Sequence, residues 1–357
     1  MLIAAAFLLV SCSRETGKDV LAALSSAASS GRFLYGHQDD LVYGKNWHVA
    51  ADSVLSDPLE RSDIRAVCGE YPAMTGFDIA GIELRDAENI DGVPFELMRR
   101  AAVTHHERGG IVTFSWHPRN PLTGGDAWDV SSDGVVASVL PGGVNHGMFM
   151  DWLSLAADFF ASLKDSRGRR IPFIFRPWHE NFGGWFWWSG DLCSDEQYKD
   201  LYSMTYEYLA VARGLRNIVW AYSPNSGLTA AMVSGRYPGD SCVDIIGLDH
   251  YCYGKGEEAE EYYMDVLRSD LGMLGAFASD HGKLLALCET GYEAIPDPPW
   301  WTSALLKGLE GIPVCYVLTW RNAWDKPAHY YAPFPGSPDA EDFKVFCKDP
   351  RTVFLDN

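Results

Sequence analysis

The residues best suited to chemistry lie in one stretch of the chain, residues 171–190, which reads IPFIFRPWHENFGGWFWWSG. Its first part, residues 172–176, is a short apolar run that is typical of a strand buried on both faces. The end of that run carries Arg176, His179, Glu180 and Asn181, and the next seven positions contain five aromatic residues, namely Phe182, Trp185, Phe186, Trp187 and Trp188. Packing favours apolar residues and does not require an Arg, a His and a Glu at the end of a strand. The stretch is therefore the first candidate for a functional site.

Aromatic rings around a carboxyl group suit a sugar-binding site. Aromatic faces stack on the C–H faces of pyranose rings, and a carboxyl group that is poorly hydrated among such rings has a raised pKa. A glutamic acid that stays protonated near neutral pH can act as a general acid on a glycosidic oxygen. Glu180 is predicted to be this acid. The 13 tryptophans of the chain agree with carbohydrate binding, although an aromatic-rich core would also account for them.

Strand-like apolar runs recur along the chain, with longer segments of helical character between them. We expect eight strands, at residues 32–37, 64–70, 111–116, 172–176, 218–223, 244–249, 284–288 and 314–319. We expect helices at residues 18–30, 94–108, 148–164, 195–213, 257–281, 299–310 and 339–346. A repeated strand–helix order predicts parallel pairing, and eight such strands close into a barrel. The predicted fold is α/β, a single (β/α)8 TIM barrel with elaborated βα loops, of which residues 118–145 are one.

Polar residues follow most of the predicted strands at the point where each strand ends. They are His37 and Gln38, Glu70 and Tyr71, His117, His179 and Glu180, Asp249 with His250 and Tyr251, Glu289, and Trp320 with Arg321. The active site of a barrel lies at the carboxyl ends of its strands, and scattered surface residues would not share this position. An open doubly wound sheet usually has a G-x-G-x-x-G loop after its first strand, and this chain has none there. Asp78 fits either the cleft after the second strand or a turn.

A second carboxylate, Glu289, follows the apolar run 285–288. In an eight-stranded barrel the ends of the fourth and seventh strands face one another, so we expect Glu180 and Glu289 to lie on opposite sides of the mouth. Two carboxyl groups about 5–5.5 Å apart across a scissile bond are typical of a retaining glycosidase. Glu289 would then be the ionised nucleophile. The competing interpretation is a pair of structural carboxylates in salt bridges.

The composition limits the possible partners. A formal net charge of −19 argues against nucleic acids and anionic membranes and is compatible with a neutral polysaccharide. The sequence has no CxxC pair, no cysteine–histidine spacing typical of a metal site and no His-x-His at the first strand, so we expect no metal and no cofactor. We also expect a monomer. Apart from Cys12 the chain has seven cysteines, and one disulfide is possible in an exported protein, although the sequence does not identify the pair.

Residues 1–11 are predicted to be an export segment. The first twelve residues, MLIAAAFLLVSC, are too few to span a bilayer but fit the apolar part of a secretory signal. Residues 9–12 (LVSC) resemble a bacterial lipobox, which implies that Cys12 carries a lipid anchor. We therefore expect an exported protein anchored to the outer membrane, and the lack of an acidic run after Cys12 favours the periplasmic face over the cell surface. Residues 12–30 would form a lead-in and residues 31–357 the catalytic domain.

Several short motifs carry a resemblance to a known family. Residues 176–181 read RPWHEN, Trp185 and the pair 187–188 follow, and residues 289–291 read ETG. Further matches are GHQ at 36–38, SWH at 115–117, DHY at 249–251 and TWRN at 319–322, so the motifs extend from the first strand to the eighth. The chain resembles glycoside hydrolase family 26, the β-mannanases of a larger clan of (β/α)8 hydrolases. His179 makes the resemblance specific, because the wider clan usually has Asn before the acid/base residue.

The resemblance implies a role for each matched residue. Glu180 would be the acid/base and Glu289 the nucleophile, with Tyr251 orienting the nucleophile. Five residues would bind the sugar: His117 and His179 at the cleavage point, Trp185 and Trp320 as stacking surfaces on either side, and Arg321 at a neighbouring glycone-side subsite. Three would support them, namely Arg176, which pairs with a carboxylate of the site, Asn181 and His37. The competing interpretation of His37, His117 and His250 is an ordinary core or rim histidine.

The substrate stays open at this point. The family acts mainly on β-1,4-mannans, and minorities act on β-1,3-xylan or mixed-linkage β-glucan. A non-catalytic mannan-binding protein would keep the same aromatic cleft. Endo or exo action depends on whether loops such as residues 118–145 block one end of the cleft, and the tolerance of galactosyl branches depends on the same loops.

Overall fold

The computed structural model describes residues 17–355, so the predicted export segment 1–11 and the predicted anchor Cys12 lie outside the described residues. Eight parallel strands form a barrel: β1 (Phe33–Gln38), β5 (Met74–Asp78), β6 (Ile111–Ser115), β7 (Phe173–Arg176), β8 (Ile218–Tyr222), β9 (Ile245–Cys252), β10 (Leu284–Tyr292) and β11 (Val314–Thr319). Each strand pairs with the next in this order, and β11 pairs with β1, which closes the ring. The predicted (β/α)8 barrel is confirmed.

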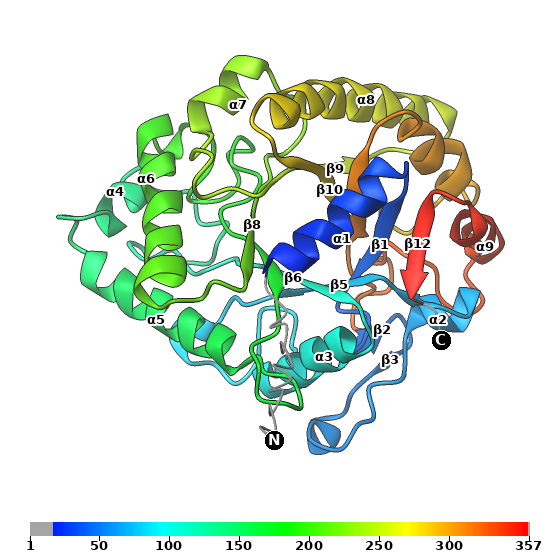
Figure 1. The fold of residues 1–357 in the computed structure, drawn as a ribbon, viewed down its shortest axis with the longest axis horizontal. Coiled ribbons are helices and arrows are strands. Elements are labelled where there is room, and N and C mark those ends of the chain that lie inside the picture. The colour runs from blue at the N-terminus through cyan, green and yellow to red at the C-terminus, as the bar shows by residue number, and fades with distance from the viewer. Residues whose placement is uncertain (1–16, 356–357) are drawn as a thin grey trace, which may run out of the picture.

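Helices cover the outside of the barrel (Figure 1). The predicted long helices are present as α3 (Phe95–Glu107), α5 (His146–Ser162), α6 (Asp195–Tyr206) with the π-helical turn η4 (Glu207–Ala212), α8 (Glu257–Asp280), the π-helical turn η5 (Trp301–Leu306) and α9 (Ala340–Lys348). Shorter helices are α4 (Val135–Val139), α7 (Ala230–Arg236), η1 (Ala51–Ser53), η2 (Ile82–Leu84) and η3 (Gly190–Leu192). The apolar face of α5, with Phe149, Leu153, Ala156 and Phe160, is buried at helical spacing against the barrel.

The prediction of a strand at residues 64–70 is wrong. The segment forms the helix α2 (Asp63–Cys68), because Ser62 caps its start by accepting a hydrogen bond from the backbone N–H of Arg65 and Gly69 ends it with a φ of 93°. The second barrel strand is β5 instead, so Asp78 ends a barrel strand, whereas Glu70 and Tyr71 do not. A short apolar run has no periodicity that separates a strand from a buried helix, and the cap residues carried the signal.

Four short strands lie outside the ring, and the last of them joins the carboxyl-terminal end of the described chain to its first barrel strand. β12 (Thr352–Leu355) pairs parallel with the start of β1 and antiparallel with β4 (Tyr71–Pro72). A hairpin of two strands with two residues each, β2 (Tyr43–Gly44) and β3 (Trp47–His48), follows β1. None of these four strands was expected from the sequence. Each is too short to show the alternation of apolar and polar residues by which a strand is recognised.

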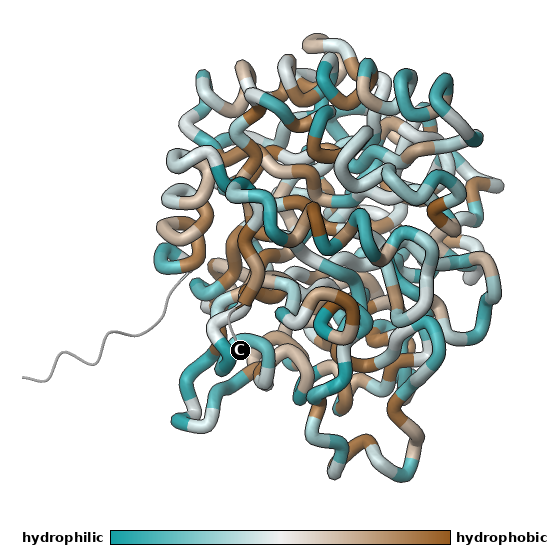
Figure 2. The backbone as a smooth tube through the Cα atoms, turned by 90° about the vertical axis from the view of Figure 1, so that its right-hand side faces the viewer, coloured by the Kyte–Doolittle hydropathy of each residue, from teal (hydrophilic) through white to brown (hydrophobic). Residues whose placement is uncertain are grey.

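The helix α1 (Gly17–Ser29) lies across the amino-terminal end of the barrel, where it contacts β1, β8 and β11. Its Val20 and Leu24 belong to the same buried cluster as barrel residues such as Met74, Val219 and Leu318. In Figure 1 the helix crosses the middle of the ring, and in Figure 2 the most hydrophobic segments run through the inside of the molecule. Since α1 covers the amino-terminal end, the strand ends that carry polar residues lie at the opposite end of the barrel.

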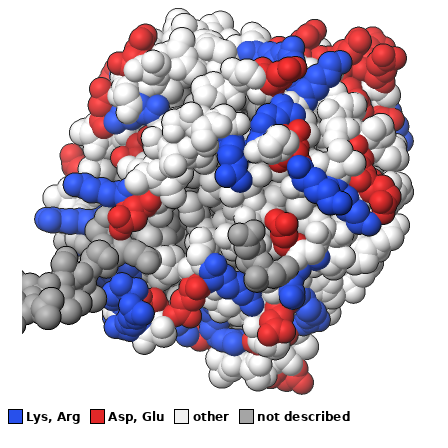
Figure 3. Space-filling view, turned by 45° about the vertical axis from the view of Figure 1, so that its right-hand side comes forward, with Lys and Arg blue, Asp and Glu red and all other residues white. Residues whose placement is uncertain are grey.

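The surface charge is mixed on the face that Figure 3 draws. Lys and Arg side chains there are interspersed with Asp and Glu side chains and do not gather into one patch. The described residues of this face form no basic patch that would attract a polyanion, which agrees with the net charge of −19.

Candidate active site

Glu180 lies in a turn after β7 whose backbone adopts an uncommon conformation. The φ angles of Trp178 and Glu180 are 56° and 52°, in the left-handed region that costs a non-glycine residue about 1–3 kcal/mol. Two hydrogen bonds hold the turn: the backbone N–H of Glu180 donates to the carbonyl of Ser223 at 2.8 Å, and Nε1 of Trp188 donates to the carbonyl of His179 at 2.8 Å. The loop after β8 and the aromatic segment thus fix the position of Glu180.

The aromatic run after Glu180 contains three buried rings, the half-buried Phe182 and one exposed ring. Trp187 and Trp188 are fully buried and Phe186 nearly so, with Phe186 stacked on Trp188 at 4.5 Å. Trp185 is different, because 41% of its surface is exposed. Most of these rings therefore pack inside the protein, in agreement with the alternative of an aromatic-rich core. Trp185 is the exposed ring of the run and the one most available for stacking.

The environment of Glu180 favours its protonated form. Burial and the negative charge of Glu289 raise the pKa of Glu180 to about 7, against the effect of Trp185, whose Nε1 donates a hydrogen bond to Oε2 of Glu180 at 2.6 Å. The carboxyl group is therefore protonated in a large fraction of molecules at neutral pH. The effect of Glu289 on Glu180 also indicates that the two carboxyl groups lie near each other at the carboxyl-terminal end of the barrel.

Glu289, in β10, is held as an acceptor. It is 4% exposed, forms an ion pair with Arg176 through Oε1 and accepts a hydrogen bond from the hydroxyl of Tyr251 at Oε2, at 2.7 Å. Arg176 also donates to Asp249 at 2.8 Å, and Ser223 donates to the other oxygen of Asp249 at 2.6 Å. Burial lowers the pKa of Arg176, but the two carboxylates outweigh it and raise the pKa well above its usual value. The guanidinium and the hydroxyl of Tyr251 thus each hold one oxygen of Glu289 and fix the orientation of its carboxyl group.

His117 and His179 form a buried pair that Asp78 anchors. Nδ1 of His117 lies 2.6 Å from Oδ2 of Asp78, and the Nε2 atoms of the two histidines lie 3.0 Å apart. Burial lowers the pKa of His117, but the charge and hydrogen bond of Asp78 outweigh it, so the pKa is raised. Burial and the charges of Arg176 and His117 lower the pKa of His179 well below its usual value. Of the two rings, His117 therefore binds a proton more readily than His179. Trp320 lies edge-on to His117 at 6.4 Å.

Arg321 joins two loops beside this pair. It donates to the hydroxyl of Tyr43 at 3.1 Å and forms an ion pair with Asp91 at 3.1 Å. The hydroxyl of Tyr43 donates in turn to Asp39 at 2.6 Å. Burial lowers the pKa of Arg321, but its neighbours Tyr43 and Asp91 outweigh it and raise the pKa. The charged side chain fixes the β2–β3 hairpin and the loop after β5 at one side of the site.

Three of the polar residues singled out at strand ends lie behind the site. His37 is fully buried with Nδ1 at 3.0 Å from Asp40, and Asn181 is fully buried and donates to the hydroxyl of Tyr222 at 3.3 Å. His250 lies 3.0 Å from the carbonyl of Tyr263 and stacks on its ring. Their hydrogen-bond partners are protein groups, and His250 packs in the core. The supporting roles of His37 and Asn181 stay a prediction.

Comparison with known proteins decides the family. The model of glycosyl hydrolase family 26 matches residues 11–285. The chain belongs to this family. It is 43% identical to a GH26 β-mannanase of Bacteroides ovatus, BoMan26A, over 96% of each chain, with a TM-score of 0.89. The catalytic domain of a GH26 endo-β-1,4-mannanase from Bacillus sp. JAMB-750 is 31% identical over 95% of this chain and 91% of that chain, with a TM-score of 0.85.

Two curated relatives are longer than this family 26 chain. A mannan endo-1,4-β-mannosidase of Bifidobacterium adolescentis is 31% identical over 94% of this chain and 35% of its own length. One from Thermothelomyces thermophilus is 28% identical over 76% of this chain and 52% of its own length. The chain thus spans about a third to a half of the length of these relatives.

Three residues that the structure brings to the candidate site were not predicted from the sequence or were left open. Asp78 was assigned equally to a turn, because the misplaced second strand hid that it ends β5. Trp128, in the loop 118–145, stacks on His117 at 5.3 Å with nearly parallel planes and is 46% exposed. No strand-end pattern marks such a loop residue, and its only signal was the aromatic type. The third is Tyr43, which binds Arg321 from a hairpin that was not predicted.

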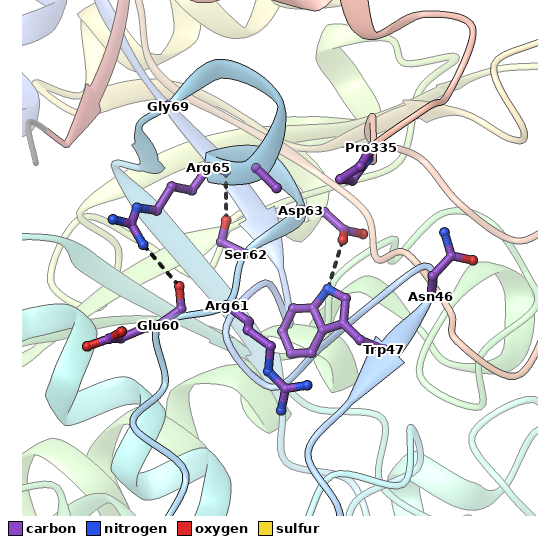
Figure 4. Close-up of a pocket in the computed structure, with 10 residues that line it drawn as sticks. Asn46, Trp47, Glu60, Arg61, Ser62, Asp63, Arg65, Gly69 and Pro335 are labelled. Atoms are coloured by element: carbon purple, nitrogen blue, oxygen red, sulfur yellow. Dashed lines mark hydrogen bonds between the residues drawn. The ribbon is translucent and has the colours of Figure 1, made fainter.

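A cavity of about 620 Å³ lies away from the carboxylates, between the β2–β3 hairpin and α2 (Figure 4). Arg61 lies over the ring of Trp47 at 4.7 Å there, and Nε1 of Trp47 donates to Asp63 at 2.9 Å. Neither Glu180 nor Glu289 lines this space. The chemistry of the side chains, and not the size of a cavity, therefore identifies the candidate active site.

Proposed function

We propose that this chain is a retaining glycoside hydrolase that cleaves β-1,4-mannosidic linkages in mannan, galactomannan or manno-oligosaccharides. The observation that supports it most is the unequal pair of carboxyl groups. Glu180 has its pKa raised to about 7, whereas Glu289 lies between a buried guanidinium and the hydroxyl of Tyr251. One acid and one nucleophile are what a double displacement needs.

In the first step, Glu289 attacks the anomeric carbon while Glu180 gives its proton to the glycosidic oxygen. The bond to the leaving sugar breaks, and the glycone is left as an ester of Glu289. Because the charge of Glu289 helps to raise the pKa of Glu180, esterification of Glu289 lowers that pKa again. Glu180 is then ionised and suited to the second step.

In the second step, Glu180 removes a proton from water, and the oxygen of that water attacks the anomeric carbon. Glu289 leaves as a carboxylate and Glu180 regains its proton, so the reaction consumes one water per glycosidic bond. Two displacements at the same carbon give net retention of configuration. No cofactor takes part in this proposal.

The sugar-binding roles are part of the proposal. We assign His117 and His179 to the sugar at the cleavage point, Trp185 and Trp320 to stacking on either side, and Arg321 to the neighbouring glycone-side subsite. Tyr251 would orient Glu289 through its hydrogen bond. Mannan is favoured as substrate because the similar proteins above are named as mannanases. The runner-up is a hydrolase of β-1,3-xylan or mixed-linkage β-glucan on the same fold.

The test compares linear β-1,4-mannan, β-1,3-xylan and mixed-linkage β-glucan, each incubated with the wild type, Glu180→Ala and Glu289→Ala. We expect reducing sugar from mannan, with the rate lowered by orders of magnitude in both variants. Hydrolysis of xylan or glucan alone would move the function to the runner-up, and mannan binding without any hydrolysis would indicate a non-catalytic binding protein. Chromatography of the products over time adds the mode of action: mannobiose from the outset indicates exo action, and a spread of longer oligosaccharides indicates endo action.

We further propose that the protein is exported and lipid-anchored through Cys12, facing the periplasm. The lipobox-like residues 9–12 support this. In the part of the chain that the structure describes, no helix is long and apolar enough to cross a membrane. Labelling of cells with a radioactive fatty acid should mark the wild type and not Cys12→Ala, and protease treatment of intact cells should leave the protein uncut. An unlabelled wild type would contradict the anchor.

A further inference from the structure

Two cysteines, Cys68 and Cys347, end helices that pack against each other at the side of the barrel. Cys68 is the last residue of α2, and Cys347 is the last residue but one of α9. Both are half-buried against the outer core. The helices α2 and α9 contact each other, and the two thiols are near enough for each to influence the pKa of the other, although the residues are far apart in the sequence. The fold thus brings together one particular pair out of the seven cysteines described.

The backbone around the pair is fixed on both sides. α2 leads into β4 and α9 leads into β12, and these two strands pair antiparallel, with Tyr71 opposite Leu355 and Pro72 opposite Phe354. A disulfide needs two Cα atoms about 4.4–6.8 Å apart with their Cβ atoms directed at each other. Helix ends that pack together and continue into paired strands keep the two cysteines on neighbouring parts of the backbone, as a disulfide requires.

The other thiols of the described chain are placed differently. Cys193 and Cys242 donate to backbone carbonyls, and Cys288 lies 2.9 Å from the hydroxyl of Tyr316. Burial raises the pKa of Cys193 to about 11 and that of Cys288 to about 12, which suppresses the reactive thiolate. Cys68 and Cys347 are instead only half-buried, whereas the other five described cysteines are buried. They are therefore the two thiols that an oxidant in solution can reach.

We propose that Cys68 and Cys347 form a disulfide when the chain meets a disulfide oxidant, such as oxidised glutathione or an oxidised thiol oxidoreductase. The thiolate of Cys68 attacks one sulfur of the oxidant and displaces the other as a thiolate. Cys347 then loses its proton and attacks Sγ of Cys68, which releases the second sulfur of the oxidant. Two protons and two electrons pass from the cysteines to the oxidant, which ends as two thiols.

The cross-link would join the first outer helix to the last and enclose nearly the whole barrel. Such a bond stabilises the fold mainly because it restricts the unfolded chain. It also anchors α2, whose Asp63 accepts hydrogen bonds from the backbone N–H of Lys45 at 2.7 Å and from Asn322 at 3.0 Å (Figure 4 shows Asp63 in its cavity). Asn322 follows Arg321 directly, so the cross-linked helix supports the loop at one side of the candidate active site.

The experiment uses the purified full chain, reduced and then equilibrated in buffers of increasing ratio of oxidised to reduced glutathione. Quenching, alkylation and peptide mapping by mass spectrometry identify each cysteine separately, so Cys12 does not disturb the result. We expect one cross-linked peptide pair, joining Cys68 to Cys347, with the other described cysteines alkylated. The melting temperature of the oxidised wild type should exceed that of the reduced form by several degrees. Cys68→Ala and Cys347→Ala should each lack both effects, and the control Cys242→Ala should keep both.

The proposal is overturned if Cys68 and Cys347 remain fully alkylated under the most oxidising conditions, or if another pair forms the cross-link. It is also overturned if the oxidation-dependent rise of the melting temperature persists in Cys68→Ala. The mapping needs only the wild type, so a variant that folds poorly does not remove the test. Hydrolysis of mannan is not part of the readout, and the result is therefore independent of the proposed function.

Discussion

Nε1 of Trp185 donates a hydrogen bond to Oε2 of Glu180 at 2.6 Å, so the exposed ring of the aromatic run contacts the proposed acid directly. This bond stabilises the carboxylate, while burial and the charge of Glu289 favour the protonated form and together prevail. If Trp185 also stacks on a sugar, as proposed above, this hydrogen bond links substrate binding to proton transfer. The two roles can be separated by substitution.

Replacing Trp185 with Phe keeps an aromatic ring and removes the hydrogen bond. Because that bond lowers the pKa of Glu180, its loss raises the pKa above about 7. Glu180 must be protonated to act as the acid, so the alkaline limb of the profile of kcat/KM against pH should move to higher pH. Trp324→Phe, an exposed tryptophan that stacks on His48, is the control and should leave the limb in place. An unchanged or lowered limb in Trp185→Phe would contradict the assignment.

Tyr251→Phe should lower kcat with folding intact. The hydroxyl of Tyr251 donates to Oε2 of Glu289, and a hydrogen bond to a charged group contributes about 1.5–3 kcal/mol, which corresponds to about 10- to 100-fold in rate if it orients the nucleophile. Steady-state kinetics on a soluble manno-oligosaccharide measures the effect. A change in KM alone would show that Tyr251 binds substrate and does not orient Glu289.

Arg176→Met should destabilise the protein. The substitution leaves Asp249 and Glu289 buried without their cation, and breaking a buried ion pair on one side costs about 3–5 kcal/mol. Urea unfolding followed by tryptophan fluorescence gives the free energy of unfolding. Lys344→Met, which removes an exposed pair with Glu341, is the control and should change it by less than about 1 kcal/mol. Equal effects of both substitutions would argue against a structural role of Arg176.

Asp78→Asn should lower the pKa of His117. Burial alone lowers that pKa, and the Asp78 carboxylate reverses the effect, so removal of the charge lets burial prevail. NMR titration of histidine side chains labelled with ¹⁵N measures the shift. Ser115→Ala removes a hydrogen bond to Asp78 but keeps its charge, and it should shift the pKa much less. If both variants titrate like the wild type, Asp78 does not control His117.

The barrel and the two carboxylates could be predicted because each depends on local pattern. The buried strands are apolar runs. Glu180 lies in the turn just after β7, and Glu289 follows the apolar first half of β10, which continues to Tyr292. Other residues of the site lie outside the barrel strands. Tyr43 belongs to the β2–β3 hairpin, and Asp91 and Trp128 belong to long loops. Their positions follow from tertiary contacts, which the spacing of one sequence does not encode.

The error at residues 64–70 has a physical cause that the sequence contained. Ser62 and Gly69 flank the segment as the N-cap and the C-cap of a helix. These two signals outweigh the apolar run between them. Placing the strand at Met74–Asp78 would have identified Asp78 as a strand-end residue. The fully buried Trp187 and Trp188 show the opposite limit, since aromatic type alone does not separate a wall from a stacking surface.

The central claim is that Glu289 becomes covalently attached to the sugar. The most direct measurement is incubation with a 2-deoxy-2-fluoro-β-mannosyl fluoride, whose fluorine slows the second displacement, followed by mass spectrometry of the intact chain and of its peptides. We expect one added glycosyl unit, located on Glu289 and absent in Glu289→Ala. A label on another residue, or turnover of mannan by Glu289→Ala near the rate of the wild type, would contradict it.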